Sequence, residues 1–320
     1  MVHIYEFRLE GRQIREIPPA EFAYREPPEG VFYWFDGEGT EGLPPLLEQL
    51  GFFPDLLREF HAEDLTPHLE EQESSLTIFS PWIDNLEDPG RPPAVSRGLV
   101  FLTRHYFLSV SEGSHPPMDR LRRNFRKEFQ HAASAGFLLF LFFDEQMSGW
   151  AGRLERLEES AEGIEESVHE RASPAVNQEI FRLKKRVLLA RKHLAAERDI
   201  LMRISGKKMA MITEAGRQSL GDLYHHATNL TNSLEMIREI LSFTQDSYLS
   251  VLSQKMNEVM KVLTLIATIV LPISLVPAIY GMNFRWMPGL ESRHGFWLSL
   301  GGMGAAGLLL IGYFRRKGWL

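Results

Sequence analysis

The sequence contains no cysteine, and this absence excludes several classes of protein. A chain without cysteine has no disulfide framework, no zinc–thiolate site and no thiol nucleophile. The first 117 residues also lack a nucleophile elbow and a His-x-x-x-His pair. No nucleophile–base pair stands out elsewhere, so the sequence does not predict an enzyme.

Positive charge is also scarce, with 35 Lys and Arg against 42 Asp and Glu, a net charge of −7. No basic domain stands out, so we expect no nucleic-acid partner. The first ten residues, MVHIYEFRLE, have no apolar stretch behind a basic start, and no signal peptide is expected. The first apolar span must therefore itself direct insertion into a membrane.

Two long apolar runs lie near the C-terminus. Val262 to Ile279 holds eighteen residues without a charge, eleven of them Leu, Ile or Val. At about 1.5 Å per residue this run is roughly 27 Å long, close to the ~30 Å hydrocarbon core of a bilayer. Gly295 to Phe314 adds twenty residues without an ionisable side chain. One such run also suits a buried core helix, but two in succession favour a membrane hairpin.

The charges at the ends of the runs predict the orientation of the hairpin. The connecting loop has two basic residues, Arg285 and Arg293, and the opposite ends carry five: Lys255, Lys261, Arg315, Arg316 and Lys317. Basic residues favour the cytoplasmic side. We expect a multi-pass protein of the cell (inner) membrane, in contact with lipid, with both termini in the cytoplasm.

A short motif joins the two spans. Tyr280-Gly281-Met282-Asn283 follows the first span, Asn257 to Thr264 (NEVMKVLT) begins it, and FRRKGWL closes the chain. In this arrangement the sequence resembles the CorA family of divalent-cation transporters. The close match covers about residues 217–320, and upstream the resemblance is one of layout. It implies a homopentamer that transports Mg²⁺, with Zn²⁺, Co²⁺ or Ni²⁺ as alternative ions.

We predict the fold class α+β, with an N-terminal cytosolic α/β domain, long coiled-coil-like stalk helices and two C-terminal transmembrane helices. The expected segments are a cytosolic α/β domain (1–117), antiparallel charged helices (118–205), a stalk helix (206–261), a pore-lining span (262–279), the GMN motif with an external loop (280–294), a second span (295–314) and a basic cytosolic tail (315–320). In the first domain, β-rich runs predict strands at 2–7, 31–35, 76–79, 98–103 and 106–110, the last two forming a hairpin. Short helices are expected at 45–50 and 55–60.

Helical periodicity dominates from Met118. A seam of apolar residues at alternating spacings of four and three predicts a coiled-coil helix (Trp150, Leu154, Leu157, Ala161, Ile164, Val168). Ser173-Pro174 is typical of a helix start. The helix before it has an acidic outer face and the helix after it a basic one, which predicts an antiparallel pair with matched charge. A third helix starts near Gln218 and has no proline until Pro272, so it needs lateral partners and indicates an oligomer.

One face of this third helix is small or polar. At 100° per residue it contains Asp246, Ser250, Ser253, Asn257, Met260, Thr264, Ala267, Leu271, Ser274 and Ala278. Such a face suits the lining of a water-filled path, and close helix packing is the alternative. By the resemblance, Met260, Leu263 and Leu271 are hydrophobic constrictions that gate by dewetting.

The motif Gly281, Met282 and Asn283 is the expected selectivity filter. Mg²⁺ holds six waters tightly and dehydrates reluctantly. A ring of Asn283 amide oxygens, with Gly281 carbonyls, accepts hydrogen bonds from those waters, whereas carboxylates would hold the ion too tightly. We expect Gly281 to let the chain leave the helix and Tyr280 to brace the loop by stacking; a plain helix C-cap is the alternative reading.

Two departures from the family pattern concern the loop. The family often has Met-Pro-Glu-Leu where this chain has Met287-Pro288-Gly289-Leu290. The missing glutamate removes negative charge at the mouth, Glu291 is the expected substitute, and Arg285 adds positive charge. Both departures bring the zinc-handling branch of the family into consideration.

The resemblance also implies regulation by cytosolic metal. Asp222 and Asp246 match acidic positions used for metal sensing between subunits, and Asp84 is the expected partner from a neighbouring subunit. Mg²⁺ that bridges carboxylates of adjacent subunits would stabilise the closed ring. Exposed aspartates on a polar surface are the alternative reading.

Three functions remain open from the sequence. The leading hypothesis is a homopentameric, channel-like Mg²⁺ influx transporter closed by cytosolic Mg²⁺. The second is a transporter of Zn²⁺ or another transition metal with the same fold, coupled to protons. The third, of another class, is a membrane-anchored coiled-coil scaffold whose hairpin is only an anchor.

Overall fold

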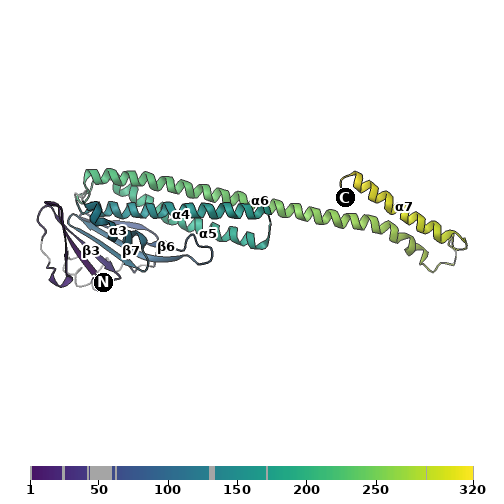
Figure 1. The fold of residues 1–320 in the computed structure, drawn as a ribbon, viewed down its shortest axis with the longest axis horizontal. Coiled ribbons are helices and arrows are strands. Elements are labelled where there is room, and N and C mark those ends of the chain that lie inside the picture. Colours follow the sequence, from purple (N-terminus) through teal and green to yellow (C-terminus); the bar gives the residue numbers. More distant parts are fainter. Residues whose placement is uncertain are drawn as a thin grey trace. The chain divides into compact units, whose positions relative to one another are not determined.

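The computed structural model describes residues 2–23, 26–41, 43, 60–61, 63–129, 134–170, 172–285 and 287–319. The chain forms two compact units, Met1–Gln245 and Asp246–Leu320, which are described separately (Figure 1). The short helices predicted at 45–50 and 55–60 lie outside the described residues, apart from Phe60.

The first unit contains an eight-stranded sheet. Its strands are β1 (Val2–Arg8), β2 (Gln13–Ile17), β3 (Val31–Glu38), β4 (His68–Glu71), β5 (Ser75–Phe79), β6 (Trp82–Asp84), β7 (Ala94–Thr103) and β8 (Tyr106–Glu112), with a 3₁₀ turn η1 (Pro19–Glu21) after β2. The strand order is β2-β1-β3-β8-β7-β5-β4, and β6 pairs with β7. Only β3 and β8 pair in parallel among these ladders; the others are antiparallel.

All five predicted strands are confirmed, including the β7–β8 hairpin. The sequence missed β2, β4 and β6, whose residues read QIREI, HLEE and WID. The first two end the sheet, where charged side chains protect an edge from pairing with another chain. The third is only three residues long. These strands therefore show little of the apolar alternation by which strands are predicted.

The sheet is buried on both faces because its side chains alternate. In β3, Phe32 and Trp34 point to one core and Tyr33 and Phe35 to the other. The first core also contains apolar side chains of the helices, so one face of the sheet is covered by them (Figure 1). The other core is smaller and includes Leu108 of β8.

Five helices follow the sheet. They are α3 (Pro116–Glu128), α4 (Gly136–Glu170), α5 (Pro174–Gly206), α6 (Glu214–Tyr280) and α7 (Gly295–Arg316). The predicted start of α5 is confirmed, because the hydroxyl of Ser173 accepts a hydrogen bond from the Val176 amide. The predicted unbroken third helix is also confirmed, since α6 runs for 67 residues.

The α4 and α5 helices pack by their apolar seams. On α4 the predicted seam is buried at Trp150, Leu154 and Leu157. On α5, Ile180 and Val187, which are seven residues apart, are buried. The predicted charge matching is not found: among the described residues, no ion pair joins the acidic face of α4 to α5. The exposed rows therefore lie in solvent, and apolar burial holds the pair together.

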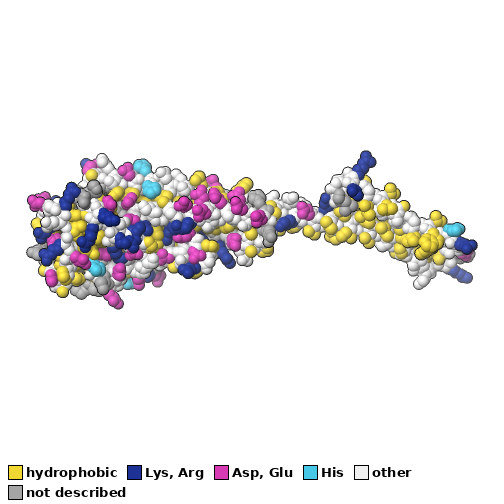
Figure 2. Space-filling model, viewed as in Figure 1, with side chains coloured by type: hydrophobic (Ala, Val, Ile, Leu, Met, Phe, Trp, Pro, Cys, Tyr) yellow, Lys and Arg dark blue, Asp and Glu magenta, His cyan; other side chains and the backbone are white. Residues whose placement is uncertain are grey.

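The second unit consists of α6 from Asp246 onward, a loop, and α7. The helices touch along one side of α6, where Leu265 is buried, as is Phe314 of α7. A side chain at Gly307 of α7 would meet Ile273 at 3.2 Å, so the helices approach closely there. Most other apolar side chains of this unit are exposed, and Figure 2 shows them as a continuous surface.

Candidate functional site

The expected selectivity motif lies directly after α6. The amide of Gly281 donates to the Pro277 carbonyl at 2.8 Å, and that of Met282 to Ile279 at 3.2 Å, so helical bonding ends here. Asn283 is exposed and begins the irregular loop. Its carboxamide has no hydrogen-bond partner in the part of the chain that the structure describes, and is thus available to a ligand.

The hydroxyl of Tyr280 helps to hold the loop, since it donates to the Pro288 carbonyl at 3.1 Å. No ring contact of Tyr280 occurs among the described residues, which do not include Trp286 of the same loop, so the predicted stacking stays a prediction. Gly281 does not have a left-handed backbone; a Cβ there would lie 3.1 Å from the Pro277 carbonyl oxygen.

The loop explains one departure from the family pattern. Gly289, which replaces the expected glutamate, has φ of 91°, a conformation that favours glycine. A glutamate at this position would be strained in this loop. The side chains of Glu291 and Arg285 are both exposed.

The small and polar stripe of α6 is exposed along its length. From Asn257 to Ala278, each stripe residue named from the sequence is exposed in the single chain. The two hydroxyls within the span bond to their own helix, Thr264 to the Met260 carbonyl at 2.8 Å and Ser274 to the Leu271 carbonyl at 3.0 Å. The bulky members Met260, Leu263 and Leu271 are 57%, 58% and 66% exposed. Since α7 covers the side that contains Leu265, the stripe is left open for other copies or water.

The three expected regulatory aspartates lie apart from any complete metal site. Asp84 ends β6 and its Oδ2 lies 3.5 Å from the Ser96 hydroxyl. Burial raises the pKa of this carboxyl, and the charge of Arg153 opposes the shift. Asp222 and Asp246 are exposed on α6. Among the described residues no group of three His, Cys, Asp or Glu side chains is placed to hold a metal ion.

A buried acidic residue was missed by the sequence reasoning. Glu197 of α5 is fully buried and accepts hydrogen bonds from Gln146 Nε2 at 2.9 Å and from Trp150 Nε1 at 2.7 Å. Burial raises its pKa to about 7, against the opposing effect of these donors. A signal was present in the sequence, because Glu197 lies in heptad register with Leu183 and Ala190.

These features combine an α+β unit with a long helix that continues into an apolar C-terminal hairpin, as in a membrane protein. Two described helices, α6 and α7, are long and apolar enough to cross a membrane. The family model described as "CorA-like Mg2+ transporter protein" matches residues 29–316, so the chain belongs to that family, which is one of transporters and not of enzymes.

Individual relatives agree with this assignment. The chain is 31% identical over 223 residues to the cobalt/magnesium transport protein CorA of Thermotoga maritima, which is 69% of this chain and 64% of that protein. It therefore spans just under two thirds of this relative. With YfjQ of Bacillus subtilis it shares 29% identity over 327 residues, 100% of this chain and 98% of that protein. The CorA magnesium transporter structure from Methanocaldococcus jannaschii has the same fold, with a TM-score of 0.85, 24% identity, and 100% and 99% of the two chains covered.

Proposed function

We propose that this protein transports divalent cations, with Mg²⁺ as the preferred ion, through a path lined by α6 in a homopentamer. The observation that carries the proposal is the stripe from Asn257 to Ala278, which is small or polar and left uncovered by α7. A face of this kind is poorly suited to lipid, which favours Leu and Ile. It suits the inner wall of a ring of identical helices.

Selection is assigned to Gly281, Met282 and Asn283. The Asn283 carboxamide, exposed and unpartnered among the described residues, can accept hydrogen bonds from the waters around Mg²⁺ without removing them. A neutral oxygen ring binds the hydrated ion weakly enough to release it. Below the ring, Met260, Leu263 and Leu271 would close the path by dewetting, because their side chains interrupt the polar stripe.

Gating is assigned to Asp84, Asp222 and Asp246 acting between copies. One chain gathers no three-residue metal site among its described residues, which fits ligands contributed by two subunits. Cytosolic Mg²⁺ that bridges these carboxylates would stabilise the closed ring by its binding free energy. When cytosolic Mg²⁺ falls, the like charges repel and the ring opens. In this arrangement both termini are cytoplasmic and the loop after Asn283 is external.

Ion flux into proteoliposomes tests this proposal. With Mg²⁺ supplied outside, Asn283→Ala is expected to lower flux by about tenfold or more, because the hydrogen-bonding ring is removed. The matched control is Asn229→Ala, the same substitution at an exposed position in the first unit. Flux unchanged by Asn283→Ala would contradict the filter and favour a scaffold whose hairpin is only an anchor.

A second candidate is a transporter of Zn²⁺, Co²⁺ or Ni²⁺ driven by protons. The loop favours it, because Gly289 removes a negative charge and the exposed Arg285 adds a positive one near the entrance. The same assay separates the two candidates when each ion is supplied alone at several pH values. Mg²⁺ flux independent of a proton gradient supports the first; flux of Zn²⁺ alone, increased by a proton gradient, supports the second.

A further inference from the structure

A cationic cleft lies on the first unit. It has a volume of about 490 Å³ and lies between the loop Pro89–Pro93 and one face of α5. The α5 side chains are spaced at i, i+3, i+4 and i+7, so they form a single face: Arg182, Lys185, Arg186 and Leu189. The loop contributes Arg91 and three prolines.

Four cationic side chains line this cleft, and no acidic side chain does. Arg182 and Lys185 are exposed, and neither takes part in a hydrogen bond or ion pair within the part of the chain that the structure describes. Arg91 has one carboxylate nearby, that of Asp88 at 3.7 Å. The cleft therefore combines positive charge with free donors.

One of the four cationic side chains, Arg186, is buried. Arg186 is only 7% exposed, and its guanidinium donates to the carbonyls of Asn85 at 2.5 Å, Leu86 at 2.8 Å and Arg91 at 2.5 Å. These acceptors are neutral, and no described carboxylate forms an ion pair with Arg186. A buried charge without a counter-charge is costly. An anion in the cleft would supply it.

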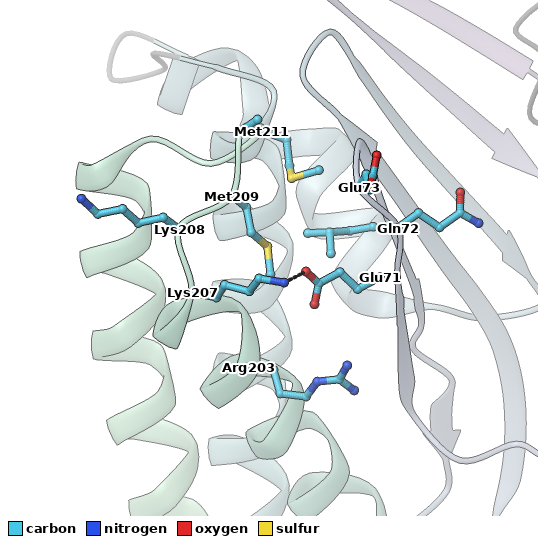
Figure 3. A pocket seen from close by; sticks show the side chains of 10 residues that line it. Glu71, Gln72, Glu73, Arg203, Lys207, Lys208, Met209 and Met211 are labelled. Atoms are coloured by element: carbon cyan, nitrogen blue, oxygen red, sulfur yellow. Dashed lines mark hydrogen bonds and ion pairs between the residues drawn. The ribbon is translucent and has the colours of Figure 1, made fainter.

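A second cleft, drawn in Figure 3, differs from this one in its charges. That cleft, at the end of α5, also contains three cations, Arg203, Lys207 and Lys208. Its lining includes Glu71 and Glu73, however, and Lys207 forms an ion pair with Glu71. The charges there are largely balanced within the protein, whereas no acidic side chain lines the cleft beside Arg186 and no described carboxylate forms an ion pair with it.

The chemistry of the lining indicates the class of ligand. Arginine guanidinium groups bind phosphate oxygens through paired hydrogen bonds. The volume is in the range of sites for small molecules. Apolar walls from Pro92, Pro93 and Leu189 would contact an organic part of the ligand. An adjoining hollow shares Arg182 and Arg186 with the cleft and also contains Glu87 and Glu179, which would repel an extended polyanion such as a nucleic acid.

We propose that the cleft between residues 89–93 and α5 binds a small organic phosphate that carries at least two negative charges. The loop that forms one wall lies between β6 and β7, so an occupant would contact the segment that follows Asp84. This binding is independent of ion transport.

Calorimetric titration of the full-length protein in detergent tests the proposal. ATP and inorganic pyrophosphate are the two probes, each in metal-free buffer so that chelation of Mg²⁺ does not contribute heat. We expect saturable binding of one ATP per chain and about tenfold weaker binding of pyrophosphate, which has no organic part to contact the apolar wall. Equal affinities would overturn the requirement for an organic group, and no saturable binding of either would overturn the site.

Two double variants with the same change in charge localise the binding. Arg182→Gln with Lys185→Gln removes two cations from the cleft and should weaken ATP binding by about tenfold or more. Lys192→Gln with Arg198→Gln removes one Lys and one Arg from α5 outside the cleft and should leave it unchanged. Equal weakening by both would assign binding to the general charge of α5 and overturn the cleft. Circular dichroism checks that both variants fold, and a negative result leaves the transport proposal standing.

Discussion

The two units of this chain differ in how far their apolar side chains are exposed. In the first, Trp34 and Phe107 are fully buried and Trp150 is 1% exposed. In the second, Leu271, Phe296 and Leu308 are 66%, 69% and 73% exposed. The first unit buries its core by itself, and water is its solvent. The second leaves most of its apolar surface exposed in the single chain, which suits contact with lipid or with other copies.

This comparison predicts that the first unit depends on its own buried polar contacts. Arg122 donates from Nε to Asp36 Oδ2 at 2.6 Å and from Nη2 to Oδ1 at 3.0 Å, with Asp36 buried. Arg122→Ala leaves that carboxylate without its counter-charge, although the Ser109 hydroxyl still donates to it, and should lower the free energy of unfolding by roughly 3–5 kcal/mol.

Chemical unfolding followed by tryptophan fluorescence measures this loss. Arg126→Ala on the same helix is the matched control, because Arg126 is exposed and its ion pair with Glu16 is long, at 3.9 Å. It should cost at most about 1 kcal/mol. Equal losses in the two variants would contradict the importance of the buried pair.

The second prediction concerns pH and Glu197. Burial raises the pKa of Glu197 to about 7 from an ordinary 4.5. Between pH 4.5 and pH 7, Glu197 is therefore protonated in the folded state and ionised in the unfolded state. The stability due to protonated Glu197 is complete below pH 4.5 and is lost as pH rises through 7. The loss is on the order of 3 kcal/mol.

Glu197→Gln isolates this effect, since glutamine is neutral and still offers an acceptor to Trp150. Burial lowers the pKa of both His115 and His193 to about 4, so these histidines destabilise the unit as pH falls, in wild type and variant alike. We expect the melting temperature of the variant, relative to wild type, to rise between pH 5 and pH 8, as checked by differential scanning fluorimetry. A difference that does not change with pH would contradict the raised pKa.

The third prediction concerns the packing that the second unit does have. Gly307→Leu should push α7 from α6, because even a Cβ at this position lies 3.2 Å from Ile273. Overpacking of this kind costs about 1–3 kcal/mol. Gly304→Leu is the control, since a Cβ there meets nothing within 4 Å. Thermal unfolding in detergent compares them, and equal stability would show that the two helices do not rely on this contact.

The sequence predicted the parts of the fold that have long periodic patterns. The spans, the α4 seam and the continuous α6 repeat their signal over many residues. The strands β2 and β4 were missed because charged residues occupy these sheet edges. The charge matching between α4 and α5 was not found, because exposed ion pairs contribute too little to fix helix orientation.

The site was predictable where a motif marks it and less so where chemistry depends on geometry. Gly281 to Asn283 were identified by their place between two spans. Tyr280 was expected to stack, which stays a prediction, but a phenol has both a ring and a hydroxyl, and only the loop geometry shows that the hydroxyl is used. Glu197 looks like an exposed acid among many until packing places it beside Trp150.

In the proposed transporter, one face of α6 meets water within the membrane. Because the sequence has no cysteine, a single introduced cysteine is a unique label site. In proteoliposomes, Ala267→Cys and Ala278→Cys on the stripe should react with a membrane-impermeant maleimide. Ile266→Cys and Ile279→Cys, at the same depths on other exposed sides of the helix, should not. Reaction at Ile266 and Ile279 with none at Ala267 and Ala278 would contradict a water-filled path along this face.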